Sequence, residues 1–170
     1  MNHRFCCFNL ISLHPMPNLH IIVGDSNTRK SSLLRCLTGI GSGNATKYLD
    51  IAEAAGSSIK VYCMLSALQE NYKPRTPSEF IDYVKALSPQ ATDIAFTLRV
   101  EARGNYPSLD VYLQAFSSVG WPVVNAALLG PLACAQQQNI PCQRICAVTQ
   151  SPDLPTNKTA SQVRKVWQWA

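Results

Sequence analysis

Residues 19–40 read Leu-His-Ile-Ile-Val-Gly-Asp-Ser-Asn-Thr-Arg-Lys-Ser-Ser-Leu-Leu-Arg-Cys-Leu-Thr-Gly-Ile, and this stretch decides the fold that we expect for the chain. It opens with a short apolar run, continues with a polar turn that begins at Gly24, and closes with an amphipathic segment that begins near Lys30. The apolar side chains of that segment recur at helical spacing, and glycines adjoin its end: Leu33, Leu34, Leu37 and Ile40, with Gly39 and Gly41. The pattern predicts a strand, a tight turn and a helix.

A turn of this kind suits an anion for a simple physical reason. The first backbone N–H groups of a helix have no partner within the helix and lie at the positive end of its dipole, so they can solvate a phosphate. Gly24 lets the chain leave the strand sharply and permits close approach of the backbone. The predicted ligand is therefore anionic.

Gly24 to Ser31 resembles the Walker A motif of P-loop NTPases, which has the form G-x-x-x-x-G-K-[S/T]. The resemblance implies that Lys30 reaches the β- and γ-phosphates of ATP or GTP as a catalytic cation, and that Ser31 is a ligand of Mg²⁺. The implied nucleotide-binding residues are Gly24, Asp25, Ser26, Asn27, Thr28, Arg29, Lys30, Ser31 and Ser32. Where the motif has its second glycine, this chain has Arg29, whose side chain either obstructs the phosphate or adds a second cation to it.

The length and composition indicate one globular domain. The chain has 170 residues, of which 46% are hydrophobic and 15% charged, enough for a sizeable core. Its net charge is +5, but the basic residues are scattered, so the charge pattern does not support nucleic-acid binding. We expect residues 17–170 to form the domain and residues 1–16 to be an appendage of uncertain order, with either Met1 or Met16 as the start of translation.

The cysteine pattern and the absence of long apolar segments indicate in which cellular compartment the protein is expected. The seven cysteines form no disulfide framework and no zinc-ligand spacing, which is typical of reduced, mostly buried thiols. No segment is long enough to span a bilayer. The sequence therefore predicts a cytoplasmic protein.

Strand-like and helix-like segments alternate along the rest of the chain. Expected strands lie at 47–53, 59–68, 93–100, 122–129 and 144–148, and expected helices at 77–87, 109–119, 131–138 and 160–169. Thr76-Pro77-Ser78-Glu79 reads as a capping box with proline at the first helical position. This alternation predicts a three-layer α/β domain, with a mostly parallel sheet of about five strands and helices on both faces, as in P-loop NTPases. Ligands of such sheets bind at the carboxyl ends of the strands.

An acid that positions metal or water is harder to name. P-loop enzymes carry one at the end of a second strand, and Glu101 is our candidate, because it closes the expected strand 93–100. Arg99, Glu101 and Arg103 are spaced by two and are expected to share one face of that strand. Hydrolysis or phosphoryl transfer, as by an NTPase or kinase, is consequently left open.

Two other readings start from the same residues. In the first, the chain is a degenerate P-loop domain that acts as a scaffold, with Trp167 and Trp169 of the closing helix as a docking edge for a protein partner or as part of the domain's own core. In the second, Gly24-Asp25-Ser26 resembles the first block of GDSL esterases, which implies that Ser26 is a nucleophile. That chemistry needs a histidine base, and no histidine follows His20.

Overall fold

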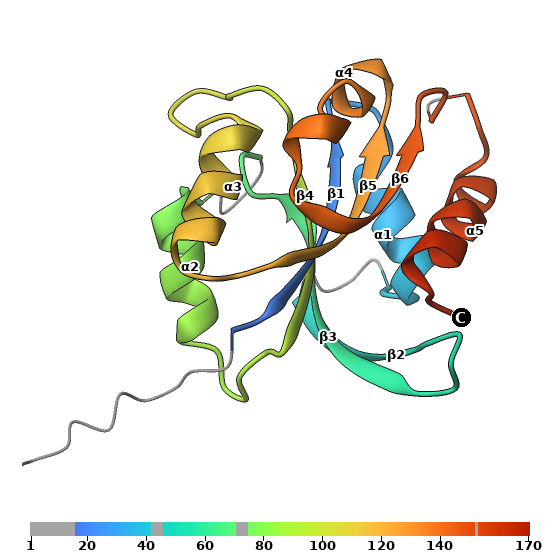
Figure 1. The fold of residues 1–170 in the computed structure, drawn as a ribbon, viewed down its shortest axis with the longest axis horizontal. Coiled ribbons are helices and arrows are strands. Elements are labelled where there is room, and N and C mark those ends of the chain that lie inside the picture. Colours follow the sequence, from blue (N-terminus) through green and yellow to red (C-terminus); the bar gives the residue numbers. More distant parts are fainter. Residues whose placement is uncertain (1–15, 42–45, 71–74, 152) are drawn as a thin grey trace, which may run out of the picture.

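The computed structural model describes residues 16–41, 46–70, 75–151 and 153–170 (Figure 1). The appendage expected at 1–16 lies outside the described residues except for Met16, which is exposed. The strands are β1 (Asn18–Gly24), β2 (Thr46–Ala52), β3 (Ser58–Ala67), β4 (Asp93–Leu98), β5 (Val123–Leu129) and β6 (Cys142–Val148). The helices are α1 (Lys30–Thr38), α2 (Pro77–Lys85), α3 (Leu109–Ser118), α4 (Pro131–Cys134), the 3₁₀ helix η1 (Gln137–Asn139) and α5 (Thr156–Trp167).

Within the described residues, six strands form one sheet in the order β2-β3-β4-β1-β5-β6. β2 pairs antiparallel with β3, whereas β3, β4, β1, β5 and β6 are parallel to their neighbours. The predicted class, α/β with a mostly parallel sheet, is confirmed. The expected number of about five strands applies to the parallel part, and β2 adds an antiparallel edge.

Helices cover both faces of the sheet, as predicted (Figure 1). On one face, α2 and α3 pack on an aromatic core that includes Phe80, Phe96 and Phe116. On the other face, α1 and α5 pack on a second core that includes Leu34 and Val163. Burial of such side chains is the main favourable contribution to folding, about 25 cal/mol for each Å² of apolar surface removed from water.

The capping box predicted before α2 is present. The backbone N–H of Glu79 donates to Thr76 Oγ1 at 3.4 Å, and the backbone N–H of Thr76 donates to Glu79 Oε2 at 2.7 Å. Pro77 occupies the first turn, where its missing N–H costs no hydrogen bond. These local interactions begin α2 at the residue that the sequence predicted.

The closing helix differs from its prediction in extent and in role. It begins at Thr156 rather than near Ala160 and ends at Trp167. Trp167 and Trp169 are 1% and 3% exposed, and Trp167 Nε1 donates to Ala126 O at 3.2 Å in β5. The docking edge proposed for these tryptophans is therefore wrong, because both indoles belong to the core of the domain.

Candidate functional site

The predicted turn lies at the carboxyl end of β1, in the middle of the sheet. β1 is flanked by β4 on one side and β5 on the other, and all three strands are parallel. The chain passes from β4 through α3 to β5, so the connection crosses β1. In open α/β sheets, a reversal of strand order of this kind leaves a crevice at the carboxyl ends of the strands, where ligands bind.

Gly24, which ends β1, is closely surrounded. A Cβ atom at this position would lie 2.5 Å from Thr28 Oγ1 and 2.9 Å from Leu129 O. Both distances are shorter than van der Waals contact, and one involves backbone. The return of the turn over the end of β1 therefore requires glycine here, as the sequence predicted.

The backbone of the turn alternates in handedness. Asn27 has φ 65° and Arg29 has φ 62°, both left-handed, and Arg29 is followed directly by the right-handed residues of α1. Right-handed and left-handed residues in succession form a concavity of backbone N–H groups that binds anions. Arg29 thus adopts the conformation that glycine favours, at a cost of about 1–2 kcal/mol for a residue with a Cβ atom.

The N-terminus of α1 continues this row of amides. Arg29 is the N-cap residue and provides no side-chain cap. The first helical hydrogen bond runs from Leu33 N to Arg29 O at 2.8 Å. The N–H groups of Lys30, Ser31 and Ser32 therefore have no acceptor within the helix and are available to an anion.

Lys30 folds over the turn. Its side chain is buried, and Nζ donates to Asp25 O at 2.6 Å. Thr28 Oγ1 donates to the same carbonyl oxygen at 2.8 Å. Burial lowers the pKa of Lys30 below its usual value; Glu70 and Asp25 oppose this shift, and Arg99 adds to it.

Ser31 retains the capacity to bind a cation. Its Oγ donates to Leu65 O of β3 at 2.8 Å, which leaves the oxygen lone pairs for other partners. Asp25 Oδ1 is a second oxygen in the turn, buried and without a partner among the described residues. No group of three or more histidine, cysteine, aspartate or glutamate side chains suited to a metal occurs in the described part of the chain. A Mg²⁺ ion is compatible with Ser31 if phosphate and water oxygens supply most of its ligands.

The connection between β6 and α5 supports the turn from another side. Arg29 Nη1 donates to Leu154 O at 3.0 Å, so its guanidinium is held at that connection. Ser151, which is 3% exposed, donates from Oγ to Thr28 O at 3.1 Å. Two of the turn's residues are thus fixed by hydrogen bonds to a segment more than a hundred positions away.

Sequence reasoning missed a charged cluster beside the turn. Arg99 Nη1, just after β4, lies 2.7 Å from Ser26 Oγ and 2.8 Å from Glu70 Oε1, just after β3. Gln69, which is 2% exposed, holds the Arg99 backbone: its Oε1 accepts from Arg99 N at 2.9 Å and its Nε2 donates to Arg99 O at 3.0 Å. The available signal was that Glu70 follows the predicted strand 59–68 and that Arg99 lies at the end of the predicted strand 93–100.

Glu101 does not join this cluster. β4 ends at Leu98, two residues before the end of the expected strand, so Arg99, Glu101 and Arg103 do not alternate along a strand. Arg103 Nη1 lies 3.4 Å from Glu70 Oε1, while Glu101 is exposed and has no interaction with the turn in the described part of the chain. The expectation of a shared face is corrected: the two arginines converge on Glu70.

Among the described residues, no histidine lies beside Ser26 to act as its general base. Its side chain is exposed, and its hydroxyl accepts from Arg99. Among the described residues the one histidine is His20, four residues before the end of β1 and 3% exposed. His20 Nε2 lies 3.1 Å from Asp93 Oδ1 and Nδ1 lies 2.8 Å from Asn125 Nδ2. At about 3.3 Å per strand residue, His20 is too far from Ser26 to act on it, which disfavours the esterase hypothesis.

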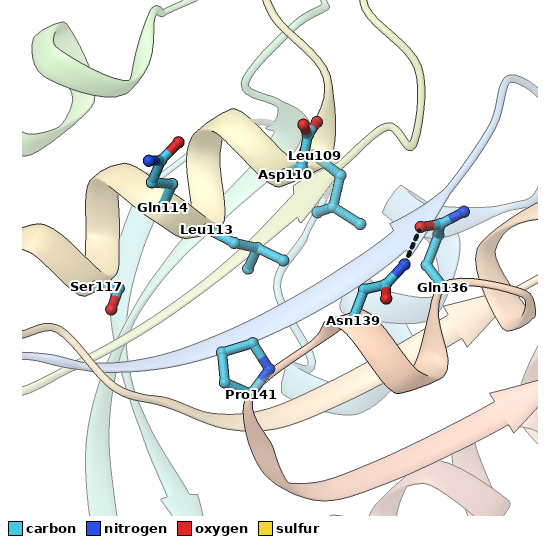
Figure 2. A pocket seen from close by; sticks show the side chains of 8 residues that line it. All are labelled: Leu109, Asp110, Leu113, Gln114, Ser117, Gln136, Asn139 and Pro141. Carbon is cyan, nitrogen blue, oxygen red and sulfur yellow. Dashed lines mark hydrogen bonds between the residues drawn. The ribbon is translucent and has the colours of Figure 1, made fainter.

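A separate groove lies between α3 and the segment that leads from α4 into β6 (Figure 2). It has a volume of about 290 Å³, and Leu109, Leu113 and Pro141 contribute much of its apolar lining. Asn139 Nδ2 donates to Gln136 Oε1 at 3.0 Å at its edge. The groove includes none of the residues predicted to bind a nucleotide, so it is distinct from the turn at Gly24.

No model of a known protein family, no curated protein and no solved structure matches this chain. Among the described residues, no helix is long and apolar enough to cross a membrane. The class that the fold defines is an α/β domain with a six-stranded, mostly parallel sheet, within the described residues.

Proposed function

We propose that residues 24–32 bind the phosphate groups of a nucleoside triphosphate, or of another phosphorylated ligand, in the manner of a P-loop NTPase. The observation that carries the proposal is the left-handed backbone at Asn27 and Arg29, followed at once by the uncapped N-terminus of α1. This conformation supports a row of backbone N–H groups suited to phosphate oxygens.

Two further features support the same function. Lys30 is buried against the turn and donates to a carbonyl oxygen that also accepts from Thr28. The ammonium can therefore turn to a phosphate without leaving that carbonyl oxygen unpaired. Arg29, which replaces the glycine of the motif, keeps the glycine-like φ and is bonded to Leu154. The substitution is therefore compatible with phosphate binding.

Binding without turnover is a second candidate, and one observation favours it. Outside the turn itself, the acid linked to it is Glu70, which accepts from Arg99 and is paired with Arg103. An enzyme of this class needs an acid that is free to hold water or metal. A phosphate-binding domain with a scaffolding role needs none.

Calorimetric titration with Mg-ATP and Mg-GTP tests the proposal. Lys30→Ala should lower affinity about 10- to 100-fold, as expected for loss of a charge-assisted hydrogen bond. Lys165→Ala is the matched control, because Lys165 is exposed at the end of α5 and its substitution should leave affinity unchanged.

The proposal is contradicted if Lys30→Ala and Lys165→Ala lose nucleotide affinity equally, or if the unmodified protein binds neither nucleotide. Phosphate release measured with the same nucleotides separates the two candidates. Turnover that disappears in Lys30→Ala identifies an NTPase, and binding without turnover identifies a scaffold.

A further inference from the structure

The cluster formed by Arg99, Glu70 and Ser26 lies beside the turn and is not accounted for by phosphate binding through residues 24–32 alone. Arg99 follows β4, the strand next to β1, and its side chain is 15% exposed. The same Nη1 atom contacts a hydroxyl of the turn, Ser26 Oγ, and a carboxylate oxygen, Glu70 Oε1. A cation from a second strand thus reaches the first half of the turn.

The charges of Glu70 and Arg99 both act on Lys30. The pKa of Lys30 is lowered by burial in the first place, and the charges of Glu70 and Arg99 then act on it in opposite directions. The carboxylate of Glu70 is thus bonded directly to Arg99 and acts on Lys30 through its charge. A phosphate oxygen can take the place of this carboxylate at Arg99.

Two buried polar atoms at the end of β4 have no partner among the described residues. One is Arg99 Nε, and the other is Oγ1 of Thr97, whose exposed fraction is zero. Thr97 pairs with Ile22, two residues before Gly24, and alternates with Phe96 and Leu98, which face α2 and α3, so it faces α1. Unmade hydrogen bonds at buried donors are unfavourable, and a ligand oxygen bound to the guanidinium of Arg99 can satisfy its Nε.

We propose that Arg99 is a second phosphate-binding residue. In the absence of a ligand its guanidinium is bonded to Glu70, and a bound phosphate replaces this carboxylate. The inference rests on the proposed function and specifies the class of ligand. A single phosphate group is satisfied by the amides of the turn and Lys30. A chain of two or three phosphates extends toward Ser26 and reaches Arg99, so the site prefers di- and triphosphates to monophosphates.

The backbone around Arg99 suits this role. Gln69 bonds both the N–H and the carbonyl of Arg99, and its Nε2 also donates to Pro107 O at 3.2 Å. The guanidinium is therefore presented from a fixed backbone. A planar, permanently charged group held in this way matches phosphate oxygens.

Calorimetry with inorganic tripolyphosphate and inorganic phosphate, at one ionic strength, tests the inference. Arg99→Gln should lower the affinity for tripolyphosphate about 10- to 100-fold and that for phosphate about 3-fold or less. Glu70→Gln should raise the affinity for tripolyphosphate about 3- to 10-fold, because the competing carboxylate is gone. Arg35→Gln is the matched control, since Arg35 is exposed in the last turn of α1 and its substitution should change neither affinity.

The outcomes distinguish this inference from the proposed function. If Lys30→Ala abolishes binding of both anions while Arg99→Gln keeps the unmodified preference for tripolyphosphate, the inference is overturned and the proposed function stands. If the unmodified protein binds neither anion, both are overturned. Should Arg99→Gln fail to fold by circular dichroism, Glu70→Gln decides: higher affinity for tripolyphosphate supports the inference, and unchanged or lower affinity overturns it.

Discussion

Lys30 Nζ lies 2.6 Å from the carbonyl oxygen of Asp25, five residues earlier in the same turn. The lysine proposed to bind phosphate is thus held by the backbone of its own loop. The same carbonyl accepts from Thr28 Oγ1, so it keeps a partner when the lysine leaves. This arrangement separates the contribution of Lys30 to stability from its contribution to binding.

Lys30→Met should therefore lower the affinity for phosphate about 10- to 100-fold, as is also expected for Lys30→Ala, while preserving the fold. Methionine has a similar shape and no charge to desolvate, and the burial that lowers the pKa of Lys30 is a cost to the folded state. We expect the free energy of unfolding to stay the same or to rise by about 1 kcal/mol. Urea denaturation measures this change. A fall of more than about 2 kcal/mol in the free energy of unfolding would show that Lys30 stabilises the fold, which contradicts this prediction.

The left-handed backbone at Arg29 predicts different effects of glycine and alanine at this position. Both substitutions remove the hydrogen bond to Leu154 O, but alanine keeps the Cβ atom that disfavours φ 62°. Arg29→Gly should therefore be more stable than Arg29→Ala by about 1 kcal/mol. Thermal unfolding of the two variants measures the difference, and equal stability would mean that the turn relaxes away from this conformation.

The buried network of His20 and Asp93 predicts sensitivity to acid. Burial alone raises the pKa of Asp93, but hydrogen bonds from His20 and Asn18 outweigh it and hold the pKa below its usual value of 3.8. The ionised carboxylate therefore contributes stability above pH 3.8 that is lost as the pH falls through the lower pKa of the folded protein. Asp93→Asn should weaken this pH dependence below pH 4, whereas Asp50→Asn, at an exposed position, should not.

Unfolding by urea between pH 2.5 and 6 provides the measurement. If the free energy of unfolding falls with pH in the same way for Asp93→Asn and for the unmodified protein, ionisation of Asp93 is not linked to acid unfolding.

Two described cysteines should differ in their reactivity. Burial raises the pKa of the Cys63 thiol to about 12, partly offset by Thr38, so at pH 8 about one thiol in ten thousand is ionised. Cys36 is exposed on α1. Iodoacetamide at pH 8, followed by peptide mass spectrometry, should modify Cys36 in the folded protein and Cys63 only in denaturant. Rapid labelling of Cys63 without denaturant would contradict its burial in β3.

Local sequence patterns were sufficient for the elements that carry the turn. The strand and helix predicted around residues 19–40 correspond to β1 and α1, and the capping box placed the start of α2 correctly. Each of these depends on interactions within a few residues. Spacing of apolar side chains and cap chemistry therefore predict them.

The rest of the candidate site depends on pairings between distant segments. Arg99 and Glu70 meet because β3 and β4 are neighbours that end at the same edge of the sheet. No local pattern specifies strand order. The expected strand end at Val100, two residues beyond the observed end of β4 at Leu98, is the reason that Glu101 was favoured as the acid. The burial of Trp167 and Trp169 similarly depends on α5 packing against α1 and β6, which brings Trp167 to Ala126 of β5.

The crowding at Gly24 affects how a mutational scan of this protein should be interpreted. Because a methyl group there would meet Thr28 Oγ1 and Leu129 O, substitutions are expected to disappear from any library selected merely for folded protein. Depletion at that codon consequently carries no information about ligands. Intolerance at Ser26 or Arg99, which lie at the rim of the turn, would be the informative signal.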